Sequence, residues 1–369
     1  MPTATPALPT LPTATLPPRS YTDPAVFERE RERIFRREWH CVAREDQLAR
    51  PGDYVAFELF GEPLVAVRGD DGRLRVLSGV CRHRWMPVVA SGSGNRRSFQ
   101  CPYHLWTYGL DGRLIGAPDM QRSAGFERAR CALPQLAVET WHGFVYTSLA
   151  PDAAPLAPRL AGLARALAPY DLASLRTLPP LVFEHDWNWK VLVDNFIESY
   201  HHQGPHADTL QPLVPAAGTW AEDADGPYVL LHNPTKNGVP IPTVFAPRPA
   251  LGDAQRAEFL VAAVFPFHLF AVQPDSLVWY RMEPLAVDRF RLFIHPCVPA
   301  EAADDPAQRP AIEGLRSFLD LVHRQDMEAC DGVQRGVGAA LAAPGPLSHL
   351  EKPIAQLARW WRERMEASP

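Results

Sequence analysis

The chain has 369 residues, of which 46% are hydrophobic and 21% charged, and its formal charge at pH 7 is −5. A chain of this length and composition is expected to be globular, with room for two domains that each bury a substantial core. The acidic balance gives no reason to expect nucleic-acid binding. No apolar run reaches the roughly 20 residues that cross a membrane, and the N-terminus lacks the basic and apolar regions of a secretory signal. We therefore expect a cytoplasmic protein with no membrane partner.

Residues 1–20 are rich in Pro and Thr and are predicted to form a disordered lead-in. A helix is expected over residues 21–40. Asp23 suits its N-cap and Pro24 its first helical position, where a missing backbone N–H costs nothing.

Residues 41–150 change to short stretches of alternating apolar residues separated by turn sequences. Asp71-Gly72 and Asp111-Gly112 are strong hairpin signals. This part is predicted to be a small antiparallel β domain.

Two short motifs in this domain carry one Cys and one His each. They read Cys81-Arg82-His83 and Cys101-Pro102-Tyr103-His104. Thiolate and imidazole groups at this spacing indicate a metal site. Two loops with one sulfur and one nitrogen each suit a Rieske [2Fe–2S] cluster, in which both Cys bind one iron and both His the other. A structural zinc site is the alternative, but zinc sites more often pair Cys with Cys and His with His along the chain.

A second domain is expected over residues 151–369, and a helix over 186–202 carries its first candidate site. Glu198 and His201 would share one face of this helix by their i, i+3 spacing. A Gly-Pro pair would then end the helix and turn His206 back towards His201. Two such histidines are typical of the 2-His-1-carboxylate site of non-heme Fe(II) oxygenases, which needs one more carboxylate.

A helix over residues 311–334 offers that carboxylate. Its apolar residues recur at three-four spacing, and Asp326 stands where the stripe requires an apolar side chain. A buried, unpaired carboxylate costs several kcal/mol, so Asp326 needs a partner, which an iron ion would supply. A salt bridge or hydrogen bond with Arg324 or His323 would also meet that need, and the pattern alone does not decide between these interpretations.

Together these motifs resemble those of the catalytic α subunits of Rieske non-heme iron oxygenases, of the aromatic-ring-hydroxylating type. The likeness extends over residues 21–361. In the second domain it is carried by Asn195, Glu198, Tyr200, His201, His206, Gln325 and Asp326.

The resemblance implies an α+β fold with two parts. An N-terminal Rieske antiparallel β domain over residues 41–150 would precede a C-terminal helix-grip (START/SRPBCC-like) catalytic domain over 151–369. The helix-grip sheet would include strands at 258–265, 277–283 and 290–296.

The resemblance also implies roles for individual residues. The cluster would be held by Cys81, His83, Cys101 and His104. Fe(II) would be bound by His201, His206 and Asp326. Asn195 and Glu198 would belong to the catalytic machinery, with Glu198 bridging a cluster His and an iron-site His by hydrogen bonds, within or between subunits.

The implied reaction uses O₂ to hydroxylate or oxidatively demethylate a small organic substrate, as a mono- or dioxygenase. Aromatic and quaternary-ammonium compounds are the candidate substrate classes. The sequence has no convincing nicotinamide or flavin fingerprint, so electrons from NAD(P)H would arrive through a separate reductase or ferredoxin. The family implies a homotrimer.

We expect the substrate pocket to draw on aromatic residues of the strands, for which ordinary sheet core is the alternative interpretation. These residues are Phe265, Phe267, Phe270, Trp279 and Tyr280. Two other functions compete with the oxygenase. One is a Rieske electron-transfer protein whose second domain binds a ligand without oxygenase activity, and the other is a zinc-stabilised binding protein with no redox role.

Overall fold

The computed structural model describes residues 11–367, so the first ten residues of the predicted lead-in lie outside the described part. The described part of the lead-in is ordered, contrary to the prediction of disorder. The segment around Ala14 forms an isolated bridge with Pro346 and is held by backbone hydrogen bonds. Leu16 is buried there, and burial of this apolar side chain helps to fix a segment whose composition suggested disorder.

The N-terminal helix begins where the sequence predicted. After a short helix α1 (Arg19–Thr22), helix α2 (Pro24–Glu30) starts at Pro24, and the Asp23 side chain accepts a hydrogen bond from the backbone N–H of Ala25 at 2.8 Å. The helix continues as one π-helical turn, η1 (Arg31–Phe35), and ends short of the predicted residue 40.

The first β domain is a seven-stranded antiparallel sheet in the order β1-β10-β9-β4-β3-β2-β5. Its strands are β1 (His40–Arg44), β2 (Asp53–Leu59), β3 (Glu62–Arg68), β4 (Leu74–Ser78), β5 (Gly92–Asn95), β9 (Gln135–Trp141) and β10 (Phe144–Ser148). At the predicted hairpin between β3 and β4, Gly72 has a φ of +75°, a conformation that glycine adopts without strain.

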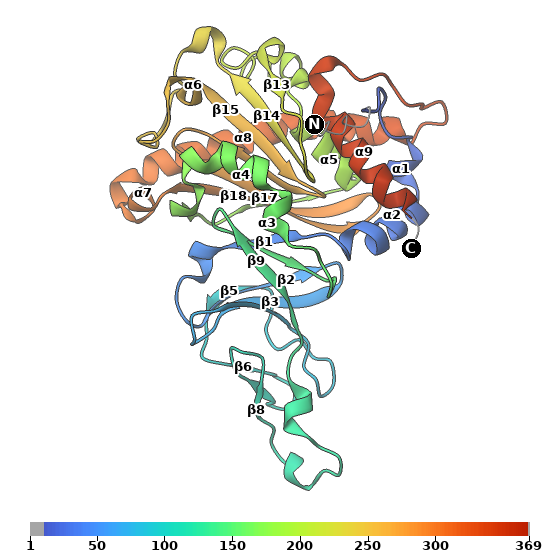
Figure 1. The fold of residues 1–369 in the computed structure, drawn as a ribbon, viewed down its shortest axis with the longest axis vertical. Coiled ribbons are helices and arrows are strands. Elements are labelled where there is room, and N and C mark those ends of the chain that lie inside the picture. Colours follow the sequence, from blue (N-terminus) through green and yellow to red (C-terminus); the bar gives the residue numbers. More distant parts are fainter. Residues whose placement is uncertain (1–10, 368–369) are drawn as a thin grey trace, which may run out of the picture.

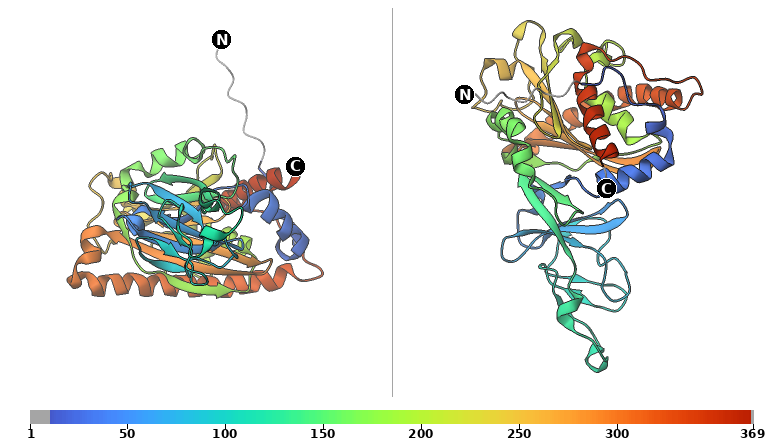
Figure 2. Two further views of the ribbon diagram at one scale, coloured as in Figure 1. Left: turned by 90° about the horizontal axis from the view of Figure 1, so that it is seen from below. Right: turned by 45° about the vertical axis from the view of Figure 1, so that its right-hand side comes forward.

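A slender arm extends from this sheet to the end of the molecule opposite the second domain (Figure 1). It is a small sheet of three strands, β6 (Phe99–Gln100), β7 (Thr107–Tyr108) and β8 (Leu114–Gly116). The right-hand view of Figure 2 shows the same separation. Both Cys-His motifs lie in or beside this arm.

The second domain is built on an eight-stranded antiparallel sheet in the order β11-β18-β17-β16-β15-β14-β13, with β12 also paired to β18. Its strands are β11 (Leu175–Thr177), β12 (Leu181–His185), β13 (Trp220–Ala221), β14 (Tyr228–Pro234), β15 (Glu258–Val264), β16 (His268–Val272), β17 (Leu277–Ala286) and β18 (Arg289–Pro299). The three strands expected here are present as β15, β17 and β18, and the last two are longer than predicted.

Helix α8 (Arg309–Val337) runs the length of one side of the second domain (Figure 2), where the sequence predicted a helix. Helices α3 (Leu156–Arg159), α4 (Ala161–Leu167), α6 (Asp253–Arg256) and α7 (Ala300–Asp304) are short and peripheral. None of the helices in the described part of the chain combines the length and apolar character needed to cross a bilayer.

A buried charge cluster ties the ends of the chain to the helix that leads into the candidate site. Lys190, at the start of α5 (Trp189–Phe196), lies 2.6 Å from Glu30 of α2, and both side chains are fully buried. Glu30 also accepts hydrogen bonds from the indoles of Trp189, at 2.9 Å, and of Trp361 in α9 (Lys352–Glu366), at 2.6 Å. With three hydrogen-bond donors around it, the Glu30 carboxylate is compensated for its burial.

Candidate metal centres and active site

The predicted helix over residues 186–202 ends early, which changes how the site is built. Helix α5 stops at Phe196, and Glu198 lies in the loop before a 3₁₀ turn, η7 (Tyr200–Gln203). The prediction that Glu198 and His201 share one helical face is therefore wrong. The Glu198 carboxylate instead accepts hydrogen bonds from the backbone N–H groups of Tyr200 and His201, and so caps the 3₁₀ turn.

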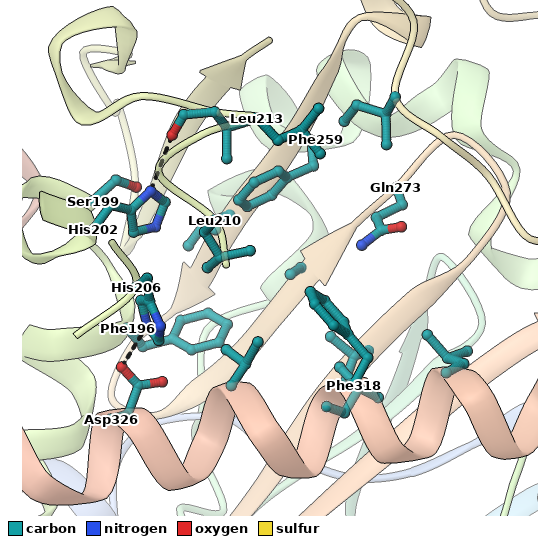
Figure 3. Close-up of a pocket in the computed structure, with 18 of the residues that line it drawn as sticks. Phe196, Ser199, His202, His206, Leu210, Leu213, Phe259, Gln273, Phe318 and Asp326 are labelled. Carbon is teal, nitrogen blue, oxygen red and sulfur yellow. Dashed lines mark hydrogen bonds and ion pairs between the residues drawn. The ribbon is translucent and has the colours of Figure 1, made fainter. Parts of the chain in front are cut away.

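Three predicted ligands meet after this turn. The donor atoms of His201, His206 and Asp326 all lie within 4.8 Å of one another. Asp326 Oδ1 is 2.9 Å from His206 Nε2 and 3.5 Å from His201 Nε2. Figure 3 shows Asp326 rising from helix α8 towards His206. Two imidazoles and one carboxylate that converge in this way form the donor set of a facial-triad Fe(II) site.

The outer nitrogen of each imidazole is held by an acceptor. His201 Nδ1 lies 2.6 Å from Glu198 Oε1, and His206 Nδ1 lies 2.9 Å from Gln325 Oε1. These acceptors fix the tautomer in which Nδ1 carries the proton, so both Nε2 lone pairs are available to a metal. Asn195 donates a hydrogen bond of 2.9 Å to Asp326 Oδ1 and so orients the third donor.

The pKa shifts of His201 and Asp326 follow from their burial and their neighbours. Burial lowers the pKa of His201, but the hydrogen bond and charge of Glu198 outweigh it and raise the pKa overall. Burial raises the pKa of the Asp326 carboxyl, but the close contact with His206 Nε2 and the nearby His201 hold this pKa below its usual range. Asp326 is therefore kept as a carboxylate, the form that binds a metal.

The alternative interpretation of Asp326 as part of an ordinary salt bridge fails on geometry. Arg324 pairs with Asp320, with Nε 2.7 Å from Oδ2, and His323 faces His185, with the two Nε2 atoms 3.0 Å apart. Neither neighbour reaches Asp326, so its partners are the two candidate ligands and Asn195.

The four predicted cluster residues lie on two matching loops of the arm. The Cys81 and Cys101 thiols are buried, while His83 and His104 are partly exposed, with their ring centroids 4.6 Å apart. Within residues 11–367 these four donors are not gathered around one point as the His201 group is. Two sulfurs on the inside and two nitrogens on the outside suit a cluster that spans two irons better than one zinc ion.

The backbone of the two loops repeats a single pattern that the sequence did not reveal. The N–H of Cys81 donates to Met86 and that of Cys101 to Trp106, at 2.9 and 2.8 Å. Trp85 and Leu105, each four residues after the Cys, both have left-handed φ values, 60° and 61°. Such strain in non-glycine residues persists only where the surroundings enforce it, and it is frequent at functional sites.

A cavity of about 290 Å³ opens beside the His201, His206 and Asp326 side chains. Its walls are mainly apolar and come from the end of α5, the sheet, the loop after His206 and α8 (Figure 3). The residues that line it include Phe196, Leu210, Phe259, Gln273, Tyr280 and Phe318. The apolar stripe of α8 that carries Asp326 also lines the cavity, through Leu315, Leu319 and Val322, but Phe318 lies off that stripe and was missed by the sequence analysis.

Of the five aromatic residues predicted to line the pocket, only Tyr280 does so. The prediction was wrong for the other four. Phe265 packs on Trp360, and Phe267 packs among the aromatic rings of the N-terminal segment. Phe270 and Trp279 lie on the opposite face of the sheet, where their ring centroids are 5.5 and 5.9 Å from that of Phe144 in the first domain. Successive strand residues alternate between faces, so Trp279 points away from the cavity that Tyr280 lines.

Comparison with known proteins identifies the family to which this architecture belongs. Residues 172–367 match the model of the ring hydroxylating alpha subunit (catalytic domain), and residues 38–138 match the Rieske [2Fe–2S] domain. The chain belongs to the ring-hydroxylating alpha-subunit family. The Rieske domain is the N-terminal part with the arm, and the family's catalytic domain is the part that holds the cavity.

Individual members of the family extend the comparison. The carnitine monooxygenase oxygenase subunit of Acinetobacter baumannii is 37% identical over 203 residues, 53% of this chain and 54% of that relative. This chain thus spans about half the length of the carnitine relatives it matches. The glycine betaine monooxygenase oxygenase subunit of Chromohalobacter salexigens is 27% identical over 95% of this chain and 85% of its own length. The structure of a quaternary ammonium Rieske monooxygenase, described for carnitine oxidation by gut microbiota and inter-subunit electron transfer, has a TM-score of 0.83, 26% identity and 95% coverage of both chains.

Proposed function

We propose that this protein is the terminal oxygenase component of a Rieske-type system and oxidises a small organic molecule with O₂. The observation that carries the proposal is the convergence of His201, His206 and Asp326 at one end of a mainly apolar cavity. When bound, the cluster would supply electrons and Fe(II) held by the triad would activate O₂.

The residues around the triad have defined tasks in this proposal. Glu198 and Gln325 orient the two imidazoles through their Nδ1 atoms, and Asn195 orients the carboxylate of Asp326. Outer hydrogen bonds of this kind raise ligand basicity and fix ligand geometry. The apolar walls keep water from the reacting atoms.

The competing electron-transfer function is less well supported. A protein that only relayed electrons would need neither the triad nor the hydrogen bonds that hold its Nε2 atoms towards Asp326. A zinc-stabilised protein with no redox role would likewise need no triad beside an apolar cavity.

The position of the arm supports a multimeric enzyme. In one chain the arm lies at the end of the molecule away from the catalytic sheet (Figure 1), so its cluster is poorly placed to serve the triad of the same chain. A homotrimer in which each arm reaches the neighbouring catalytic domain resolves this, and Glu198 would then bridge between subunits. The relative described for inter-subunit electron transfer supports the same arrangement. Electrons from NAD(P)H would come through a separate reductase.

For the substrate, two classes are supported by different observations. The named relatives act on carnitine and glycine betaine, which are quaternary ammonium compounds. The cavity contributes the rings of Phe196, Phe259, Phe318 and Tyr280, which suit a trimethylammonium group through cation–π attraction and suit an aromatic ring through stacking.

The test of the proposed function is metal content followed by turnover. Anaerobically purified protein should contain about three irons and two acid-labile sulfides per chain. His201→Ala should lose about one iron and all product formation while keeping the cluster spectrum. His232→Ala is the matched control, because His232 is bound by Glu258 and Glu222 instead of facing the triad. Normal oxidation by the His201→Ala variant would refute the assignment.

A further inference from the structure

The end of the cavity remote from the triad carries the side-chain amide of Gln273. This residue follows β16, and Figure 3 shows it across the cavity from His206 and Asp326, with the rings of Phe259 and Phe318 in between. Within residues 11–367 its amide group has no hydrogen-bond partner. An amide offers both N–H donors and a carbonyl acceptor, so Gln273 is available to pair with a polar group of a bound molecule.

The turn that presents Gln273 is itself fixed. The backbone N–H of Gln273 donates to the carbonyl of Ser276 at 2.9 Å, and the carbonyl of Pro274 accepts from the backbone N–H of Arg248 at 2.8 Å. The backbone of the turn therefore does not have to be ordered when the Gln273 amide binds a ligand, which favours recognition.

The charges around the cavity limit which polar group of a ligand can bind beside Gln273. The residues that line it, all in the described part of the chain, include no Lys and no Arg, and their carboxylates are Glu198 and Asp326 at the triad end. Arg248 contacts the turn through its backbone N–H, and its side chain, whose buried Nε and Nη2 atoms have no hydrogen-bond partner, is not among the residues that line the cavity. A ligand carboxylate beside Gln273 would give up its water without meeting a cation, which is strongly unfavourable.

We propose that the cavity selects substrates whose end remote from the triad is neutral and forms hydrogen bonds, such as a hydroxyl or carboxamide, and that it excludes a free carboxylate there. Gln273 is then a specificity-determining residue. The inference rests on the proposed function, because it takes this cavity as the substrate site. It separates this chain from the relatives named for carnitine and glycine betaine, since both of those compounds carry a carboxylate.

Four small ligands test the proposal as two matched pairs. Choline and glycine betaine share a trimethylammonium head and differ in a hydroxyl or carboxylate tail, and 2-phenylethanol and phenylacetate repeat the contrast on a phenyl head. Calorimetric titration of the iron-loaded protein without reductase measures binding in the absence of turnover. We expect the hydroxyl member of each pair to bind at least about tenfold more tightly. Equal or tighter binding of either carboxylate, or no binding of either hydroxyl ligand, overturns the proposal.

Variants at the turn make the test specific. Gln273→Arg supplies the missing cation and should shift the ratio towards the carboxylates by about tenfold or more, while Gln273→Leu should weaken the hydroxyl ligands without favouring the carboxylates. Arg248→Gln is the control and should leave the ratios unchanged. An unchanged ratio in both Gln273 variants, or loss of carboxylate binding in Arg248→Gln, would contradict the role of Gln273.

The two proposals fail differently in these experiments. The tail preference is read from binding, whereas the oxygenase is read from iron content and product. Selective binding without any product with a reductase would leave the cavity assignment standing and remove the proposed function. Product formation with equal binding of hydroxyl and carboxylate ligands would leave the proposed function standing and remove the tail preference. The head preference, trimethylammonium or phenyl, separates the two substrate classes.

Discussion

Replacement of Glu198 gives a direct test of how His201, a proposed iron ligand, is held in place. Its side chain is only 9% exposed, Oε1 lies 2.6 Å from His201 Nδ1, and Oε2 accepts from the backbone N–H of His201 at 3.2 Å. Glu198→Ala removes both contacts, and a hydrogen bond to a charged group contributes about 1.5–3 kcal/mol. Since every 1.4 kcal/mol is about tenfold, we expect Fe(II) affinity to fall by roughly 10–100-fold, the range seen when other outer partners of metal ligands are removed.

Glu198→Gln separates orientation from charge. An amide oxygen can still accept from His201 Nδ1–H, but the amide nitrogen cannot accept from the backbone N–H groups. We expect both metals to stay bound, with iron affinity reduced by about tenfold or less, while cluster oxidation becomes uncoupled from product formation.

The assay is Fe(II) titration of protein stripped of mononuclear iron but with its cluster intact, followed by single-turnover oxidation of the reduced cluster. Glu258→Ala is the matched control, because it breaks a second Glu–His pair, with Glu258 Oε2 2.9 Å from His232 Nδ1, away from the triad. Unchanged iron affinity in Glu198→Ala would refute the orienting role. Full product yield with fast cluster oxidation in Glu198→Gln would refute the bridge.

Three further predictions concern the rest of the molecule. Lys190→Met leaves the fully buried Glu30 carboxylate without its cation and should cost about 3–5 kcal/mol in urea unfolding followed by tryptophan fluorescence, with much of the loss recovered by adding Glu30→Gln. Burial raises the pKa of Glu38, but Arg364 and Arg159 together outweigh burial and lower the pKa. These ion pairs therefore stabilise the fold above the ordinary carboxyl pKa of 4.5, and the stabilisation is lost as the pH falls through the lower folded value; Glu38→Gln should flatten thermal stability against pH in that acidic range, and an unchanged profile would count against these pairs. Trp85 is 80% exposed in the loop that follows Cys81, so Trp85→Ser should leave the cluster spectrum intact but weaken self-association in analytical ultracentrifugation and slow turnover. A variant that assembles normally would exclude Trp85 from the subunit contact.

The sequence was most informative where chemistry is local. The Cys-x-His and Cys-x-x-His spacings pointed to a cluster, and Asp326 was recognisable as a carboxylate on an apolar helical stripe. The early end of α5 was not predictable from periodicity, because the apolar pattern continues past Phe196 while the Glu198 carboxylate caps the next turn instead of extending the helix.

The pocket was predicted least well, for a reason that lies in the sheet. Strand alternation identifies two faces, but both faces of the catalytic sheet are apolar. One borders the cavity, where Tyr280 points, and the other packs on the first domain, where Trp279 lies within 5.9 Å of the Phe144 ring. Only the three-dimensional packing of the two domains shows which face holds a ligand.

The buried contacts of Glu30 also bear on the order in which the protein matures during synthesis. Lys190 and Trp361, which both contact this carboxylate, leave the ribosome long after it does, so the helix that leads into the triad lacks its full set of partners until α9 has emerged. The two Cys-His motifs do not depend on residues that are synthesised late, because their four Cys and His residues lie between Cys81 and His104. Domains generally fold in the order of synthesis, so we expect the arm to fold while the second domain is still being made, and helix α5 to gain its last Glu30 partner only with α9.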